Sequence, residues 1–219
     1  MNLVAKIISW LFLPLLAPVY ALLIVFYTVN LESDFFMGNN LYILLDEQKN
    51  AILSLFIIFS FVGPAISVLL LRMSGQISTV MMDNRSERIV PSIMTNLFGI
   101  SLLSILMWKM DLNIFPGARY IFGLAAGSCS TVLMCTLITR KWKISLHAAG
   151  MGILVGFLIS YFYNMEIFNL YYLLAAVIIS GVVMSARLQL GAHDLKQLFA
   201  GFFVGTLNLI FFNYLFLNY

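Results

Sequence analysis

The stretch from about Ile7 to Tyr27 reads IISWLFLPLLAPVYALLIVFY and contains no charged residue. A helix needs about 20 apolar residues to cross the hydrocarbon core of a bilayer, so this stretch predicts a membrane span. It is too long for a typical removable signal peptide and lacks a small-residue cleavage site. Pro14 and Pro18 inside it predict a kink or a break, which a membrane helix tolerates where neighbouring helices satisfy the freed carbonyls.

Six further apolar stretches follow, and we expect them to span the membrane at about 51–71, 91–108, 120–139, 147–163, 170–184 and 198–217. The composition agrees, because 62% of the residues are hydrophobic, 10% are charged and the mean hydropathy is +1.00. A soluble domain carries about 25% charged residues. The sequence therefore predicts an all-α fold, a polytopic helical bundle of about seven (six to seven) transmembrane helices, with residues 1–219 forming a single integral membrane domain.

Three of the polar loops share one side of the membrane, because two spans separate each from the next. They hold both histidines of the chain and most of its polar chemistry. Their polar residues are Asp83, Arg85, Glu87, Arg88, Arg140, Lys141, Lys143, Ser145, His147, Arg187, His193, Asp194 and Lys196. Each set precedes an apolar run, so we expect it in the first turn of a membrane helix, with Pro91 at a first helical position and Ser145 as an N-cap. Three helix N-termini with unpaired N–H groups would favour an anion.

Two histidines among several cations suit a phosphate ester. Arginine offers a planar fork that matches phosphate oxygens. One imidazole can attack phosphorus, while the other, when protonated, gives its proton to the leaving alkoxide. The cations supply the electrostatic stabilisation that Mg²⁺ gives in kinases, so we expect no metal and no cofactor. A zinc site would need carboxylate ligands at spacings that the sequence lacks, and the net charge of +3 without a basic tail gives no reason to expect nucleic acid.

These residues resemble the motifs of a known family. The stretch ARLQLGAHDLKQLFAGFFVG at 186–205 is similar to the third motif of the membrane-bound type 2 phosphatidic acid phosphatases, or lipid phosphate phosphatases. The spacing from Arg187 to His193, together with the small residues that follow, is in register with that motif. Ser145 and His147 match the Ser and His of the family's second motif, and 83–91 echoes the first. The resemblance covers about 85–205.

The resemblance implies roles for individual residues. His193 is similar to the family's nucleophile and His147 to its general acid. Arg187 resembles a ligand of the phosphate oxygens, Ser145 assists through its hydroxyl or backbone, and Arg88 or Arg85 stands in for the first motif's cation, with Lys143 nearby. The implied substrates are lipid phosphates or diphosphates, hydrolysed through a phosphohistidine intermediate, so the expected partners are membrane lipids.

The chain also departs from the family pattern. The family's Asp, which orients the nucleophilic histidine, is Gln197 here, four residues after His193 and so on the same helix face. Glutamine accepts a hydrogen bond but does not stabilise an imidazolium by charge, unless Asp194 substitutes. Two alternatives stay open: a catalytically weak or inactive relative that binds phospholipid headgroups or scaffolds a membrane complex, and a lipid phosphotransferase.

Other polar and small residues have simpler explanations. Arg72, Arg140, Lys141 and Lys196 are typical headgroup anchors near membrane ends, and Gly201 and Gly205 form a helix-packing pattern. Most of the 12 lysines and arginines lie on the side of the three polar loops, which slightly favours the cytoplasm for that side. We expect a multi-pass protein of the bacterial inner (plasma) membrane. The sequence leaves open whether the chain forms a homo-oligomer.

Overall fold

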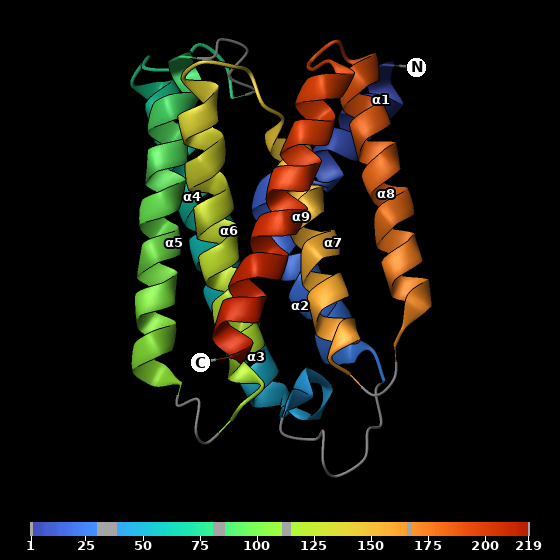
Figure 1. The fold of residues 1–219 in the computed structure, drawn as a ribbon. Helices are drawn as coiled ribbons and strands as arrows, with labels where there is room; N and C mark the ends of the chain where they lie inside the picture. The colour runs from blue at the N-terminus through green and yellow to red at the C-terminus, as the bar shows by residue number, and fades with distance from the viewer. Residues whose placement is uncertain (1, 30–38, 81–85, 111–114, 166–167, 219) are drawn as a thin grey trace.

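The computed structural model describes residues 2–29, 39–80, 86–110, 115–165 and 168–218. Within these ranges the chain is helical and contains no strand. Seven helical segments in the described ranges are long and apolar enough to cross a membrane: Leu3–Tyr27, Asp46–Met73, Ser86–Lys109, Ala118–Thr139, Leu146–Tyr163, Leu170–Gln189 and Leu195–Leu217. The predicted all-α bundle of about seven membrane helices is confirmed, and the chain is a multi-pass membrane protein (Figure 1).

The first span is broken at its prolines, as the sequence predicts. Helix α1 (Asn2–Leu11) ends before a short 3-10 turn at Pro14–Leu16, and α2 (Ala17–Tyr27) continues from there. Proline has no N–H to donate, so the α-helical hydrogen-bond ladder stops. The last carbonyls of α1 consequently have no partner within their own helix and are left to accept bonds from elsewhere.

The second span also contains an irregularity. Helix α3 (Asp46–Phe56) passes through a π-helical turn at Ile57–Val62 into α4 (Gly63–Met73). Pro64 lies just after that turn and donates no backbone N–H to the carbonyl of Ser60, which disfavours regular α-helix there. The Ser60 hydroxyl turns back onto the Phe56 carbonyl at 2.5 Å. The side chains that the turn carries are half-buried or exposed.

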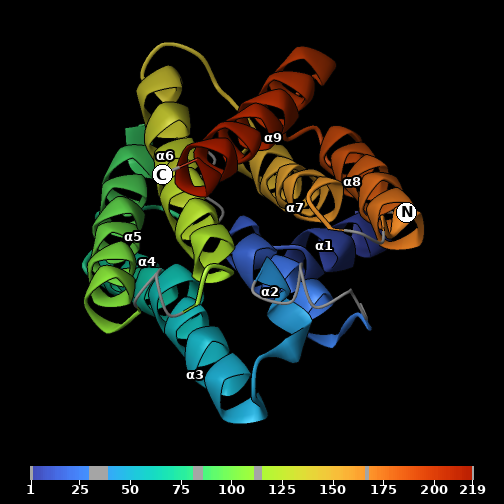
Figure 2. The same cartoon turned by 60° about the horizontal axis from the view of Figure 1, so that its bottom comes forward.

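Five more helices complete the bundle: α5 (Ile89–Lys109), α6 (Ala118–Thr139), α7 (Leu146–Tyr163), α8 (Leu170–Gln189) and α9 (Leu195–Leu217). Helices α4, α5 and α6 form one group, and α1, α7 and α8 lie on the other side, as both views show (Figures 1 and 2). Helix α9 crosses between the groups and makes its largest contacts with α7 and then α6.

Glycines allow α7 and α9 to approach closely. A Cβ added at Gly201 would lie 2.5 Å from the carbonyl oxygen of Ser145, and one added at Gly205 would collide with the carbonyl of Ala149. Gly152 and Gly156 on α7 meet the backbone of α9 in the same way. The small residues at 201 and 205 therefore pack helices, and they fix the start of α7 beside the start of α9.

Two predicted boundaries are wrong by two and by five residues, with consequences for the site. Helix α8 continues to Gln189 instead of ending near Met184, so Arg187 lies in its last turn and not at the start of the next helix. Helix α5 begins at Ile89, so Pro91 is its third residue. Proline is tolerated there because the first-turn N–H groups have no intrahelical acceptor. The described residues that directly precede α5, α7 and α9, at 86–88, 140–145 and 190–194, all lie at the end of the bundle where the chain begins (top of Figure 1), as predicted.

Candidate functional site

The turn between α8 and α9 places His193 close to Arg187. Gly191 has φ +63°, a left-handed conformation that glycine adopts without strain. The N–H of Gly191 donates to the Leu188 carbonyl at 2.9 Å, and the N–H of Ala192 donates to the Arg187 carbonyl at 3.1 Å. This pair of hydrogen bonds is a Schellman cap, which reverses the chain sharply after a helix. The Schellman cap therefore sets the spacing between Arg187, whose carbonyl takes part in it, and His193, which directly follows it.

His193 is buried and bonded to Gln197 one helical turn later. Its Nδ1 lies 2.9 Å from the Oε1 of Gln197. The side-chain Nε2 of Gln197 donates to the Oδ2 of Asp194 at 3.0 Å, and its backbone N–H donates to the Oδ1 of Asp194 at 2.8 Å. A carboxylate only accepts, so Asp194 fixes the Gln197 amide with its oxygen toward His193. Nδ1 must then carry the proton, and the lone pair of the neutral ring lies on Nε2.

The surroundings of His193 disfavour its charged form. Burial lowers the pKa of His193 from 6.5 to about 4. The hydrogen bond to Gln197 opposes that shift, while the positive charges of Arg88, Arg187 and Lys143 add to it. At neutral pH the imidazole is uncharged, which is the form that a nucleophile requires.

His147 lies in the first turn of α7, which Ser145 caps, and its ring contacts a carbonyl of α1. Ser145 is the N-cap of α7, as predicted, and its Oγ accepts from the N–H of Ala148 at 3.3 Å. The Nε2 of His147 lies 3.1 Å from the carbonyl oxygen of Ser9 in α1. Since a carbonyl only accepts, Nε2 is the protonated nitrogen, and Nδ1 is the one that remains for other chemistry.

The two histidines share the same cationic neighbours. The charges of Arg88 and Arg187 act on both the His147 ring and the His193 ring. Both arginine side chains are buried at 8% exposure. The N–H of Ser145 donates to the carbonyl of Gln197 at 3.3 Å, which ties the start of α7 to the first turn of α9. The site therefore collects residues from α5, α7, α8 and α9.

Arg88 is positioned by a short turn ahead of α5. It ends the 3-10 turn Ser86–Arg88, whose Glu87 accepts from the N–H and the hydroxyl of Ser78 at 3.0 and 2.9 Å. These bonds anchor the turn to the segment after α4. Of the two candidates for the first-motif cation, Arg88 is thus in the site, whereas Arg85 and Asp83 lie outside the described residues. Lys143 is half-buried between α6 and α7.

One part of the predicted anion site is different in the structure. The sequence predicts open N–H groups at the start of α9. Instead, the Asp194 side chain caps the first turn of this helix, so a carboxylate already occupies the helix start. Arg187 comes from a helix C-terminus. Positive charge at the site therefore comes mainly from Arg88, Arg187 and Lys143 and less from three open helix ends. Arg72, Arg140, Lys141 and Lys196 are exposed, as headgroup anchors are. Among the described residues, no three His, Cys, Asp or Glu side chains gather as metal ligands do.

Sequence reasoning missed the carbonyl of Ser9 as the partner of His147. A signal was present, because Pro14 ends α1 early and frees the carbonyls of its last turn. What the sequence does not contain is which helix the freed carbonyl faces.

The fold and the site define a multi-pass helical membrane protein with a buried histidine, His193, and a half-buried one, His147, among cations at one end of the bundle. No family model, no curated protein and no solved structure matches the chain in the three comparisons made.

Proposed function

We propose that the protein is a metal-independent membrane phosphatase that acts on lipid phosphates or lipid diphosphates. The observation that carries this proposal is that both histidines lie within the electrostatic reach of the same two buried arginines. Each guanidinium offers a planar fork of donors that matches the oxygens of a phosphate. The resemblance of 186–205 to the third motif of the type 2 phosphatidic acid phosphatases supports the same reaction.

In the first step, the Nε2 lone pair of His193 attacks phosphorus, and the bond from phosphorus to the lipid oxygen breaks. Arg88 and Arg187 hold the equatorial oxygens, whose charge develops in the transition state. His147 in its imidazolium form donates the Nδ1 proton to the leaving alkoxide, so the lipid alcohol departs neutral. The negative charge of the bound phosphate offsets the arginine charges that otherwise oppose a protonated His147.

In the second step, His147 is neutral and its Nδ1 accepts a proton from water. The water oxygen attacks phosphorus, the bond from phosphorus to His193 Nε2 breaks, and inorganic phosphate leaves. His193 returns to its neutral form and His147 to its imidazolium form, so each is ready for the next turnover. Asp194 and Gln197 take no proton in either step and serve as positioning residues.

A second function is favoured by one observation. Gln197 occupies the place of the family's Asp and carries no charge with which to stabilise a cationic ring. A relative that holds a phospholipid headgroup without hydrolysing it would need the same arginines but no activated His193. Transfer of the phosphoryl group to another alcohol instead of water uses the same first step as hydrolysis.

The experiment is phosphate release by the purified full-length protein in detergent, with EDTA present, from a panel of lipid phosphates and diphosphates. We expect release by the wild type and its loss in His193→Ala and in His147→Ala. Lys196→Ala is the matched control, since this exposed cation lies next to the site but outside it. Binding of the same lipids without release, equal in wild type and variants, would favour the headgroup-binding alternative.

As part of the same proposal, we assign the protein to the bacterial inner membrane with the site on the cytoplasmic side, which the excess of lysine and arginine at that end supports. A cysteine introduced at Lys196, an exposed position, tests the orientation. It should resist a membrane-impermeant maleimide in spheroplasts and react after lysis. Labelling before lysis would put the site on the outer face.

A further inference from the structure

A groove lies between α1 and α8 on the outer surface of the bundle. These helices are in contact, and they lie side by side in both views (Figures 1 and 2). The groove has a volume of about 390 Å³ and is lined by α1 residues between Val4 and Ile8 and by α8 residues between Ile178 and Gln189. Val4 and Ile178 are 61% and 66% exposed, so the groove is open to its surroundings. Because both helices belong to membrane spans, those surroundings are the hydrocarbon of the bilayer.

Small residues of α8 keep this α1–α8 groove open. Gly181, Ser185 and Ala186 all line it, and residues four apart share one face of a helix. A Cβ added at Gly181 would meet no atom within 4 Å. Larger side chains at these positions would fill the space between the two helices, so the groove follows from the sequence of α8.

The depth of the groove is that of one membrane leaflet. The span of α8 runs from Leu170 to Gln189, so Ile178 lies near its middle and Gln189 at its end. Between these two groove residues the helix rises by about 16 Å, at 1.5 Å per residue. This is about half of the hydrocarbon thickness of a bilayer. The groove therefore matches the hydrocarbon chain of a lipid in length, whereas a membrane helix of another protein would cross both leaflets.

Residues of the groove wall are next to residues of the candidate site. On α8, Ala186 lines the groove and directly precedes Arg187, whose charge acts on both histidines. On α1, Ile8 lines the groove and directly precedes Ser9, whose carbonyl contacts His147. Consecutive Cα atoms are about 3.8 Å apart. The same turns of the two helices thus contribute to the groove and to the cationic end of the bundle.

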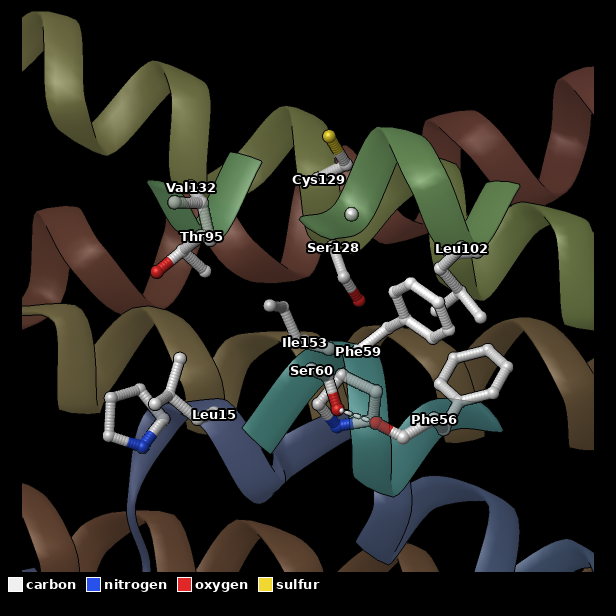
Figure 3. A pocket seen from close by; sticks show the side chains of 14 residues that line it. Leu15, Phe56, Phe59, Ser60, Thr95, Leu102, Ser128, Cys129, Val132 and Ile153 are labelled. Atoms are coloured by element: carbon white, nitrogen blue, oxygen red, sulfur yellow. Dashed lines mark hydrogen bonds between the residues drawn. The ribbon is translucent and has the colours of Figure 1, made fainter. Parts of the chain in front are cut away.

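The interior of the bundle offers less room for a chain. Two cavities in its described part measure about 50 and 60 Å³. Figure 3 shows the first of them, with Phe59, Leu102 and Ile153 in its wall. A dry cavity of about 150 Å³ takes a molecule the size of benzene, so neither of these cavities accommodates a hydrocarbon chain. The α1–α8 groove, at about 390 Å³, has more than twice that volume.

We propose that the α1–α8 groove holds one hydrocarbon chain of the lipid phosphate while the phosphate is bound by Arg187. The inference rests on the proposed function, because it takes the head of the lipid to be an anion at the cationic end of the bundle. The lipid then reaches the site sideways, from the leaflet at that end. A second chain, where the lipid has one, stays among the surrounding lipids, so the groove does not distinguish one-chain from two-chain phosphates.

The test is photo-crosslinking of the purified full-length protein in phosphatidylcholine vesicles. The probe is a long-chain alkyl phosphonate with a diazirine midway along the chain, because its carbon–phosphorus bond resists hydrolysis. We expect the label on groove residues such as Ile8, Ile178 or Val182. The matching alkyl alcohol, which lacks the anionic head, should label these residues about tenfold less, the factor that one charge-assisted hydrogen bond provides.

Two variants test the groove and its link to the head of the lipid. Gly181→Leu fills the open space, so the phosphonate label on Ile8 should fall to the level of the alcohol. Ala175→Leu is the matched control, since Ala175 is exposed on the same helix outside the groove and should leave the label unchanged. Arg187→Ala should lower the label as Gly181→Leu does, because head and chain belong to one molecule. Thermal melting verifies that the variants fold.

The outcomes separate this inference from the proposed function. Groove label that depends on the phosphonate and on Arg187, without hydrolysis of any lipid phosphate, supports the groove and overturns the phosphatase. Hydrolysis by the wild type with equal label from phosphonate and alcohol, or with label that Arg187→Ala leaves unchanged, overturns the groove. A disulfide-linked dimer formed on oxidation of Val182→Cys, and not of the wild type, would mean that a second copy covers the groove, which also overturns the inference.

Discussion

The Nδ1 of His193 and the Oε1 of Gln197 lie 2.9 Å apart, and the amide that joins them to Asp194 has only one orientation that satisfies the carboxylate. A carboxylate normally contacts such a histidine directly, whereas here an uncharged amide lies between them. Asp194 therefore orients the ring through Gln197. The arrangement keeps the tautomer that a nucleophile needs, and it gives up the direct charge that would stabilise an imidazolium.

Replacement of Gln197 tests this relay. Gln197→Leu removes the acceptor for the Nδ1 proton, so we expect kcat to fall by about 10²- to 10⁴-fold, the range associated with misplaced catalytic histidines. Gln197→Glu supplies a carboxylate. In the wild type the Gln197 amide donates to Asp194 at 3.0 Å, so the new carboxylate would lie close to that of Asp194 and the like charges would repel.

The double variant Asp194→Asn with Gln197→Glu supplies the matched comparison. Asn caps a helix about as well as Asp, and its amide can donate to the new carboxylate. We expect the double variant to be more active than Gln197→Glu alone, and its His193 to have a higher pKa than in the wild type. Additive losses from the two changes, measured as kcat in a double-mutant cycle, would argue against a relay.

The pKa of His193 can be measured directly, because the chain has two histidines. With histidine-selective ¹⁵N labelling, we expect the ring of His193 to stay neutral with its proton on Nδ1 until the pH falls to about 4. Its pKa is lower in the folded protein than the ordinary 6.5. Above pH 6.5 this ring is unprotonated in both the folded and the unfolded chain. As the pH falls from 6.5 toward 4, only the unfolded chain gains the proton, which destabilises the fold.

His147→Ala leaves one histidine and so assigns the signal. Inorganic phosphate should raise the His193 pKa, because the anion offsets the charges of Arg88 and Arg187. A midpoint near 6.5 that phosphate does not change would mean that the ring is solvated and remote from these arginines.

Much of the architecture follows from the sequence, because a membrane helix is specified by length and hydropathy alone. All seven spans, the break near Pro14 and the shared side of the three polar loops are confirmed. The helix ends were less predictable, since α8 continues through polar residues to Gln189. Hydropathy marks where the apolar core ends and does not mark where the hydrogen-bond ladder ends.

The site was predictable in its members and less in its contacts. Ser145 as N-cap and Gln197 beside His193 follow from local helix geometry, in which residues three or four apart are neighbours. The bond from His147 to the Ser9 carbonyl joins residues 138 positions apart in the sequence, and it depends on how α1 packs. No local pattern encodes such a contact.

The close approach of α7 and α9 gives a prediction for stability. Gly205→Ala places a methyl group on the Ala149 carbonyl, so the helices must separate. We expect a loss of about 1–3 kcal/mol, typical of overpacking, and lower activity because His147 and His193 move apart. Gly181→Ala on α8 is the control, since a Cβ there meets nothing within 4 Å. Equal melting temperatures of the two variants in detergent would contradict this role for Gly205.

Arg187 should not be replaceable by lysine. Lysine keeps the charge but loses the planar fork that holds two phosphate oxygens together. We expect Arg187→Lys to lower kcat/KM by about 10-fold or more, the range for a lost charge-assisted hydrogen bond. Arg140→Lys, at an exposed position, should leave kcat/KM unchanged. If Arg187→Lys retained full kcat/KM, Arg187 would act only as a point charge.

In the proposed mechanism, His193 carries the phosphoryl group between the two steps. The most direct measurement is rapid-quench mass spectrometry of His147→Ala during reaction with an aryl phosphate, whose leaving group needs no proton. Without His147 as base, the second step slows and the intermediate accumulates. We expect a phosphoryl group on the peptide that contains His193 and none in the variant that also carries His193→Ala. Turnover of the aryl phosphate with His193 unmodified, or undiminished turnover in His193→Ala, would contradict it.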